Sequence, residues 1–289
     1  MKGIILAGGK GTRLFPTTNV ISKQLLPIFD KPMIYYPIAT LMLGGIRDII
    51  IISTPSDIPF YQRLLDTGEQ WGLSFDYRIQ EKPEGIAQAF IIAEDLIQNE
   101  KVCLILGDNL FYGKLDFFRN AIKKLRFATI FAYEVDNPQN YGVVVLNKDK
   151  KPVRIVEKPL ESISKWAIPG LYLFDERASE FASTLKPSER GELEITDLQN
   201  LYLDRGELEV EIIGRGIAWL DTGTPSNLLD AALFIRAIEQ RQGRKIACLE
   251  EIALNMGYIS KSEYLRFVEQ MPDSDYKRYC LKIYEEQSE

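Results

Sequence analysis

The residues best suited to chemistry follow the first apolar segment of this 289-residue chain. Gly8, Gly9 and Gly11 form a glycine-rich turn directly after the segment Lys2 to Leu6. Where a strand leads into such a turn, backbone N–H groups can face and bind a phosphate. Arg13 adds a planar guanidinium suited to bidentate phosphate contact. The spacing matches neither the dinucleotide fingerprint nor the Walker A sequence, so the turn alone predicts either a phosphate site or an ordinary tight turn.

Three further charged side chains stand where predicted elements end. Lys23 lies between a polar turn and an apolar segment, which is typical of a second phosphate-binding cation or of a surface lysine. Asp108 and Asp221 each follow an apolar segment, and open α/β sheets bind ligands at the carboxyl edge of their strands. Each aspartate could instead cap a following helix. Two converging carboxylates would suit Mg²⁺, although the spacing does not show that they converge.

The chain contains no histidine. This absence excludes Ser-His-Asp and Cys-His hydrolases, histidine-ligated zinc sites and histidine general bases within the chain. Cys103, Cys248 and Cys280 have unrelated spacings and predict neither a zinc motif nor a disulfide framework. Catalysis would therefore use carboxylates, lysine, arginine, backbone groups and, where needed, a hard metal ion.

Composition limits the partners. The formal charge of −6 argues against a nucleic-acid polymer, because no global positive field collects phosphates, but a local basic cluster could bind one nucleotide. No apolar run approaches the ~20 residues that a membrane helix needs. The apolar run at the start is too short for a signal peptide. We expect a cytoplasmic protein without a membrane partner.

The elements that position these residues alternate between strand and helix. Apolar runs with no polar face predict strands covered by helices on both sides, at residues 2–6, 48–53, 102–106 and 128–133. Helices are predicted at residues 33–43 and 85–98. This order predicts a doubly wound sheet over the first 135 residues.

The pattern changes after that point. Closely spaced strands are predicted at residues 141–146, 153–156 and 170–174, followed by helices at 175–185 and 194–204. A strand pair at 210–214 and 217–219 precedes a long helix at 225–242 and short helices over 249–281. The sequence thus predicts a three-layer α/β fold with a mostly parallel, Rossmann-like central sheet, inserted strands and C-terminal helices.

The motifs as a set resemble the glucose-1-phosphate thymidylyltransferase family, which has the nucleotide-diphospho-sugar transferase fold. The resemblance covers nearly the whole chain. It is carried by Gly8-Gly9-Lys10-Gly11-Thr12-Arg13-Leu14-Phe15-Pro16, Ser22-Lys23-Gln24-Leu25-Leu26-Pro27, Asp30-Lys31-Pro32-Met33, Gly85-Ile86-Ala87-Gln88-Ala89-Phe90, Leu106-Gly107-Asp108-Asn109, Glu157-Lys158-Pro159, Arg190-Gly191-Glu192-Leu193-Glu194-Ile195-Thr196-Asp197 and Ala218-Trp219-Leu220-Asp221-Thr222-Gly223-Thr224.

The resemblance implies an enzyme that joins dTTP and glucose-1-phosphate to give dTDP-glucose and pyrophosphate. Implied nucleotide-binding residues are Leu6, Gly8, Gly9, Gly11, Thr12, Arg13, Gln24, Gln80, Pro83 and Gly85. Implied sugar-phosphate-binding residues are Asn109, Gly142, Glu157, Lys158, Ile168, Tyr172 and Arg190, the last of which could also be a solvent-facing loop charge. Implied catalytic residues are Arg13, Lys23, Lys158, Asp108 and Asp221, with both aspartates holding Mg²⁺.

The resemblance also implies an organisation for the chain. Residues 1–240 would form the nucleotidyltransferase core, with a nucleotide-binding part to about 135 and a sugar-binding part from 136 to 224, and residues 241–289 a helical accessory region. A homotetramer is implied. A feedback site for a rhamnose end product is implied at Lys114, Lys245, Cys248, Glu251 and Ile252.

Several positions depart from the family pattern, and two other functions stay open. Lys114 and Asn255 differ from the residues common in the feedback segments, so we expect end-product inhibition to be altered. Val145 and Pro169 differ on the sugar side. The same chemistry with a uridine nucleotide is one alternative, because thymidine and uridine differ little. A non-catalytic nucleotide-sugar sensor is the other.

Overall fold

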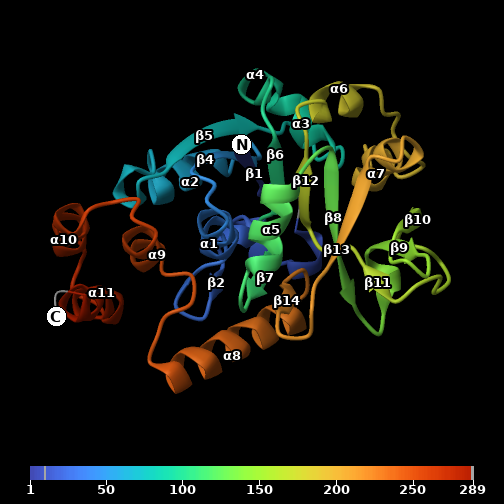
Figure 1. Cartoon of the computed structure of the whole chain (residues 1–289). Helices are drawn as coiled ribbons and strands as arrows, with labels where there is room; N and C mark the ends of the chain where they lie inside the picture. The colour runs from blue at the N-terminus through green and yellow to red at the C-terminus, as the bar shows by residue number, and fades with distance from the viewer. Residues whose placement is uncertain (10, 288–289) are drawn as a thin grey trace.

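The computed structural model describes residues 1–9 and 11–287, so Lys10 of the glycine-rich motif lies outside the described residues. A ten-stranded sheet forms its centre (Figure 1). In spatial order the strands are β10 (Pro152–Glu157), β9 (Gly142–Leu146), β11 (Trp166–Ala167), β8 (Ala128–Glu134), β12 (Leu171–Phe174), β6 (Val102–Leu106), β1 (Lys2–Leu6), β4 (Asp48–Ser53) and β5 (Ser74–Ile79), with β13 (Leu208–Ile212) paired to β8. Strands β6, β1, β4 and β5 are parallel, and β12 is antiparallel to both of its neighbours.

The two faces of the sheet have separate hydrophobic cores. Along β1, Ile5 packs into one cluster, whereas Ile4 and Leu6 pack into the other, because successive strand side chains point to opposite faces. The first cluster includes residues of α1 (Tyr35–Leu43), α2 (Ile58–Leu65), α5 (Asp116–Lys124), α8 (Pro225–Gln242), α9 (Leu249–Asn255), α10 (Lys261–Glu269) and α11 (Asp275–Glu286). The second includes residues of α3 (Gln88–Ile92), α4 (Glu94–Ile97), α6 (Ala178–Ser183) and α7 (Ile195–Asp204). The predicted three-layer α/β fold is therefore confirmed.

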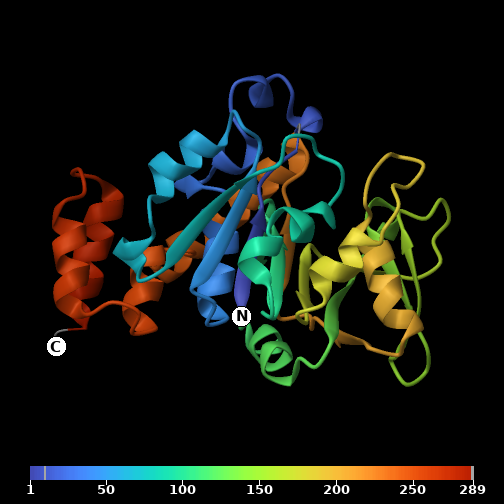
Figure 2. The ribbon, with the colours of Figure 1, turned by 90° about the horizontal axis from the view of Figure 1, so that it is seen from above.

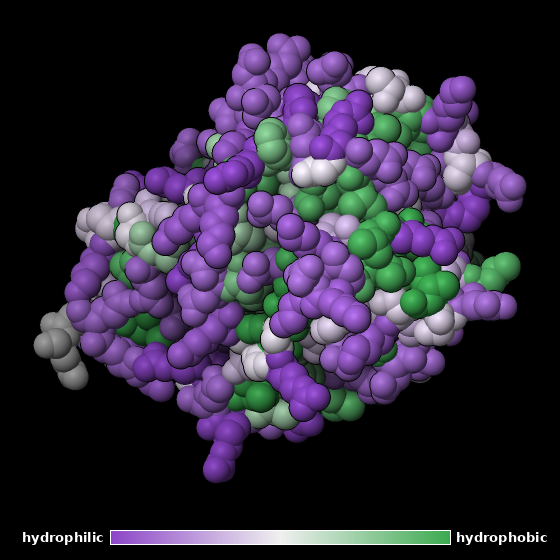
Figure 3. Space-filling model, turned by 45° about the vertical axis from the view of Figure 1, so that its right-hand side comes forward, coloured by the Kyte–Doolittle hydropathy of each residue, from purple (hydrophilic) through white to green (hydrophobic). Residues whose placement is uncertain are grey.

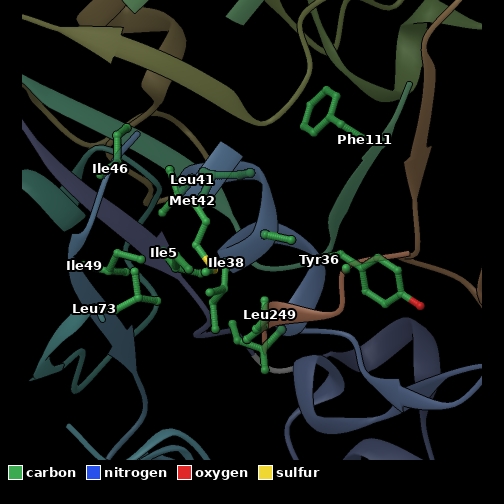
Figure 4. Close-up of a cluster of buried hydrophobic side chains, with 14 of the residues drawn as sticks. Ile5, Tyr36, Ile38, Leu41, Met42, Ile46, Ile49, Leu73, Phe111 and Leu249 are labelled. Atoms are coloured by element: carbon green, nitrogen blue, oxygen red, sulfur yellow. The ribbon is translucent and has the colours of Figure 1, made fainter. Parts of the chain in front are cut away.

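The first cluster also fixes the C-terminal helices. Figure 4 shows Ile5 and Ile49 of the sheet beside Ile38 and Met42 of α1, with Leu249 of α9 close to them. The helices α9 to α11 thus share a core with the central sheet. In Figures 1 and 2 they lie at one end of the molecule, and β9, β10 and α7 lie at the other. Hydrophilic side chains cover most of the face in Figure 3, and hydrophobic ones gather in smaller groups.

Most predicted elements are confirmed, some with the predicted bounds and others with different ends. The strand predicted at 128–133 continues to Glu134, and the long helix at 225–242 has the predicted bounds. Helix α1 begins at Tyr35 because Met33 and Ile34 donate their backbone N–H groups to Leu26 and Gln24. The helix predicted at 175–185 spans only α6, since the backbone of Asp175 instead bonds to Phe127.

Two further predictions need correction. The helix predicted at 85–98 is interrupted at Ala93, and its first residues are held away from helical geometry where Ala87 N–H donates to Leu193. The segments at 210–214 and 217–219 do not pair with each other. Instead β13 extends the main sheet beside β8, while β14 (Ala218–Asp221) pairs with β7 (Asn109–Tyr112) in a separate sheet. The strands β5 and β7 and the helices α2 and α5 were not predicted.

Candidate active site

A short antiparallel ladder brings the two predicted metal ligands together. Strand β6 ends at Leu106, and β7 follows after a turn that contains Asp108. In the β7–β14 ladder, Asp221 lies opposite Asn109, the residue after Asp108. Thr222 ties the two segments together, because its N–H and its hydroxyl both donate to the Asp108 carbonyl, at 3.2 and 2.9 Å. Neither aspartate caps a helix, since Thr224 is the N-cap of α8.

Two cations lie beside this carboxylate pair. The Lys23 ammonium, at the start of a short 3₁₀ turn, pairs with the Asp108 carboxylate. The Arg13 guanidinium packs over Gly223, where a Cβ atom would lie 2.5 Å from Arg13 Nη2 and 3.2 Å from Asp221 Oδ1. Any larger residue at 223 would therefore displace Arg13. Loops that are far apart in the sequence thus gather two cations and two carboxylates at the carboxyl end of β1 and β6.

The electrostatics of the two carboxyl groups are opposed. Burial raises the pKa of the Asp108 carboxyl, but the charge and hydrogen bond of Lys23 outweigh it and hold that pKa below its usual value. Burial and the nearby Asp108 charge raise the pKa of Asp221, against smaller opposing effects of Lys23 and Arg13. Two carboxylates that repel each other in a polar cavity fit a hard divalent cation, which would relieve the repulsion.

A cavity of about 550 Å³ extends from this pair toward β9, β10 and α7. Predicted site residues that line it are Thr12, Arg13, Asp108, Asn109, Gly142, Glu157, Lys158, Ile168, Tyr172 and Asp221, together with Glu192. Burial raises the pKa of Glu157, and the neighbouring Lys158 charge opposes this. Lys158 itself has φ of 41°, a strained backbone for a residue other than glycine, which is typical of functional sites.

Of the predicted nucleotide-binding residues, Gln24 and Gln80 lie near the end of β1 and the start of the glycine-rich turn, but neither they nor Gly85 line the cavity. The Gln80 amide lies against Gly8, and its nitrogen donates to Gln88 Oε1 at 2.6 Å. Gln24 is buried behind Gly107, and Ser22 donates to its Oε1 at 2.7 Å. Gly85 has φ of 110° and no room for a side chain, because a Cβ atom would lie 2.3 Å from the Leu193 carbonyl oxygen. Leu6, Gly9 and Gly11 belong to β1 and its turn, and Pro83 is exposed.

Among the predicted sugar-phosphate-binding residues, Arg190 is the one that does not line the cavity. Its guanidinium donates to both carboxylate oxygens of Glu194, at 3.1 and 2.7 Å, and its Nη2 lies 3.6 Å from Glu157 Oε1. In this arrangement the group is engaged by carboxylates. Its role as a phosphate clamp stays a prediction, as do the other residue roles.

Several side chains that line the cavity are absent from the predicted site residues, among them Trp219, Tyr141 and Gln199. Trp219 Nε1 donates to Asn109 Oδ1 at 2.7 Å, and Tyr141 packs on the Trp219 ring with centroids 4.9 Å apart. Trp219 was available as a signal, since it stands two residues before Asp221. Gln199 also lines the cavity, three residues after Thr196 on α7. Helical spacing from Thr196 could have identified it.

A second cavity of about 250 Å³ lies between α1, β7 and α9. The predicted regulatory residues Lys245, Cys248, Glu251 and Ile252 line it, as does Asn255. Lys114 does not line it, although Gly113 and Leu115 on either side do.

Cys248 also joins a buried hydrogen-bonded group with Cys280 and Glu250. Within that group the Glu250 carboxylate already accepts from Trp71 at 3.0 Å, Tyr276 at 2.6 Å and Cys248 at 3.6 Å. These partners satisfy the carboxylate, so we interpret the group as a core network.

Among the helices of residues 1–9 and 11–287, none is both long and apolar enough to span a bilayer.

Comparison with known proteins gives the class and then the family. A family model described as nucleotidyl transferase matches residues 2–238, so the chain is a nucleotidyltransferase. Enzymes called glucose-1-phosphate thymidylyltransferase from Neisseria meningitidis and Mycobacterium tuberculosis are 51% and 48% identical to it. The alignments cover 98% and 99% of this chain and 99% of each relative. The chain belongs to the glucose-1-phosphate thymidylyltransferase family.

Solved structures agree. A putative glucose-1-phosphate thymidylyltransferase from Bacillus anthracis, in complex with a sucrose, superposes with a TM-score of 0.76 at 40% identity, covering 82% of this chain and 95% of its own. A UDP-glucose pyrophosphorylase complexed with UDP-glucose has a TM-score of 0.72 at 24% identity, over 83% of this chain and 98% of its own, and so shows the fold alone. The predicted family, fold and enzyme class are confirmed. Nucleotidyltransferases of this type generally use a divalent metal ion, and the family acts on nucleoside triphosphate and sugar phosphate substrates.

Proposed function

We propose that the chain transfers the thymidylyl group of dTTP to glucose-1-phosphate, with Mg²⁺, and releases pyrophosphate. The observation that carries this proposal is the single cavity in which Arg13 and the Asp108–Asp221 pair meet Lys158 and Glu157. Such a cavity suits a reaction between two phosphate-bearing substrates, because cations and carboxylates for a metal stand at the same place.

The reaction needs charge compensation more than proton transfer. A phosphate oxygen of glucose-1-phosphate attacks the α-phosphorus of dTTP in line, forming an O–P bond, while the bond to the β-phosphate oxygen breaks and pyrophosphate leaves with the electron pair. The nucleophile is already an anion, so no general base is required, which agrees with a chain that lacks histidine. The barrier comes from bringing two polyanions together.

The chain's own residues would lower that barrier. Arg13 and the glycine-rich turn would bind the triphosphate, and Lys158 would hold the sugar phosphate at the attacking side. Lys23 pairs with Asp108 and so keeps that carboxylate ionised. Asp108 and Asp221 would hold Mg²⁺, which when bound offsets negative charge on the phosphate oxygens.

The remaining assignments divide the other predicted residues between the two substrates. Gln24, Gln80 and Gly85 would bind the nucleotide base, while Glu157 and the Gly142 backbone would bind sugar hydroxyls. The proposed division places the nucleotide-binding part before about residue 135, the sugar-binding part at 136–224 and a helical accessory region after 240.

The second cavity is proposed as a regulatory site for a rhamnose-bearing end product, in a cytoplasmic homotetramer. We expect the inhibition curve to differ from that of enzymes with the usual residues at positions 114 and 255. An inhibition curve matching theirs would contradict this part.

A pyrophosphate-release assay tests the proposed function. Purified protein with Mg²⁺ and glucose-1-phosphate should release one pyrophosphate per nucleotide sugar formed, and faster with dTTP than with UTP. Faster release with UTP would assign the uridylyl reaction instead. Binding of dTDP-glucose without turnover of either triphosphate would assign a sensor.

A further inference from the structure

Gln199 is a buried amide that the protein does not satisfy. Its side chain has no solvent exposure, and neither Nε2 nor Oε1 has a hydrogen-bond partner among the described residues. Buried side-chain amides are nearly always paired, and an unpaired one is destabilising. Gln199 is also one of the residues that form the wall of the 550 Å³ cavity. The missing partner is therefore expected in the cavity.

The position of Gln199 puts that partner on the sugar side. Gln199 lies on the same face of α7 as Ile195 and Thr196, one turn earlier. The Thr196 methyl group is 3.1 Å, and Glu157 Oε2 3.3 Å, from where a Cβ on Gly142 would stand. This face of α7 thus adjoins Gly142 and Glu157, the residues proposed to bind sugar hydroxyls.

The amide of Asn109, which lines the same cavity, shows the contrast. Its Oδ1 accepts from Trp219 at 2.7 Å and from the Gly170 N–H at 3.0 Å, and its Nδ2 donates to Asp108 at 3.2 Å. Asn109 is therefore held by the protein. Gln199 keeps its full capacity of two donor hydrogens and an acceptor oxygen.

We infer that Gln199 determines sugar specificity by binding one hydroxyl group of the sugar-1-phosphate; this inference rests on the proposed function. A hydroxyl both donates and accepts, so it complements an amide that offers both groups. A sugar that lacks this hydroxyl leaves the amide unpaired in the complex, and sites built in this way discriminate strongly against such analogues.

The test combines changes in the protein and in the substrate. Wild type, Gln199→Leu and the matched control Asn200→Leu are assayed with glucose-1-phosphate and its 2-, 3-, 4- and 6-deoxy analogues. Asn200 is the next residue of α7, and its side chain instead reaches the Ile155 carbonyl, at 3.5 Å. For one analogue, wild type and Asn200→Leu should lose about 10- to 100-fold in kcat/KM. Gln199→Leu should lose a similar factor on glucose-1-phosphate itself but discriminate little against that analogue, with the KM for dTTP unchanged.

Several outcomes would overturn the inference. If Gln199→Leu lost the same factor in kcat/KM on all five sugars, or lost no activity on any of them, the amide would be assigned to ordered water or to packing. Because removing an unpaired amide should not lower the Tm of the ligand-free protein, a lower Tm in both Gln199→Leu and Gln199→Met would assign Gln199 a structural role. Calorimetric binding of the same sugar phosphates keeps the test separate from the proposed function. If wild type binds the sugars selectively but forms no nucleotide sugar, the proposed reaction is contradicted while the role of Gln199 in sugar binding is retained.

Discussion

At the scale of single residues, the candidate site is defined by two aspartates in opposite electrostatic situations. Asp108 has a lysine partner and a lowered pKa, whereas Asp221 is half-buried next to a like charge and has a raised pKa. Two like charges held together in the absence of a metal ion lower the stability of the folded protein, a cost that is common at functional sites. This difference gives the two residues separable effects on stability and on activity.

Arg13 should contribute mainly to turnover. Arg13→Ala removes a cation that lies beside Asp221 and would bind the triphosphate, so we expect kcat to fall by about 10²–10³-fold. Arg126→Ala is the matched control, because Arg126 is exposed and does not line the cavity. Steady-state pyrophosphate release measures both variants. Near-normal turnover of a folded Arg13→Ala variant would remove Arg13 from the mechanism.

The two aspartates should respond to neutralisation with opposite signs. A raised folded-state pKa means that Asp221 favours folding while protonated, and this contribution is lost as the pH rises through that pKa. At pH 7 without metal, Asp221→Asn should therefore raise the Tm, by about 2–4 °C. Asp108 has a lowered pKa, so its contribution is present at neutral pH and lost as the pH falls, and Asp108→Asn should lower the Tm. Thermal unfolding in EDTA decides, and shifts of the same sign would contradict the assignment.

At the scale of elements, the ladder between β7 and β14 positions the acidic pair. Thr222 follows β14 directly, and its hydroxyl donates to the Asp108 carbonyl. The hydroxyl therefore fixes the turn that aims Asp108, without contacting a substrate.

Replacing Thr222 tests this positioning. Thr222→Val keeps the shape and removes the hydroxyl, and we expect a fall in turnover of about 10-fold or more together with a higher Mg²⁺ requirement. Thr40→Val is the control, since Thr40 is also buried and its hydroxyl donates to a backbone carbonyl, that of Tyr36, at 3.0 Å. If both variants lost stability but kept the same turnover, the ladder would have only a structural role.

The same ladder shows where sequence reasoning ends. The strands β1, β4 and β6 were predictable because each is a short apolar run buried on both faces. The partner of β14 was not, because it lies more than a hundred residues earlier and only tertiary packing selects it. For the same reason the spacing of Asp108 and Asp221 could not show that they converge. Gln199 was not predicted because whether an amide has a hydrogen-bond partner depends on the residues packed around it, which the sequence does not show.

At the scale of the whole molecule, a buried ion network links the core to the C-terminal helices. Lys31, in the short strand β3 (Lys31–Pro32) that pairs with β2 (Pro27–Ile28), is buried and bonds to Glu239 of α8 at 3.0 Å and to Asp30. Glu239 also accepts from the Ile246 N–H at 2.7 Å, and Lys245 pairs with Asp30. The network thus fixes the chain between α8 and α9.

Breaking this network should cost much more than neutralising it. Lys31→Met removes the nearer of the two cations beside the buried Glu239 carboxylate and leaves only Lys245, at 3.9 Å, so we expect a loss of about 3–5 kcal/mol in the free energy of unfolding. Adding Glu239→Gln should recover part of that loss, because it removes the buried charge that has lost its nearer cation. Urea unfolding of both single variants and the double variant measures the coupling. Strictly additive losses would show that the two charges do not interact.

The most direct test of the central claim is the Mg²⁺ dependence of pyrophosphate release from dTTP and glucose-1-phosphate. If Asp108 and Asp221 hold the metal together, Asp108→Asn and Asp221→Asn should each raise the half-saturating Mg²⁺ concentration by about 10-fold or more, as expected when a site loses a ligand. The exposed Asp230→Asn variant should leave it unchanged. A half-saturating concentration equal to that of the wild type in both folded variants would contradict the account.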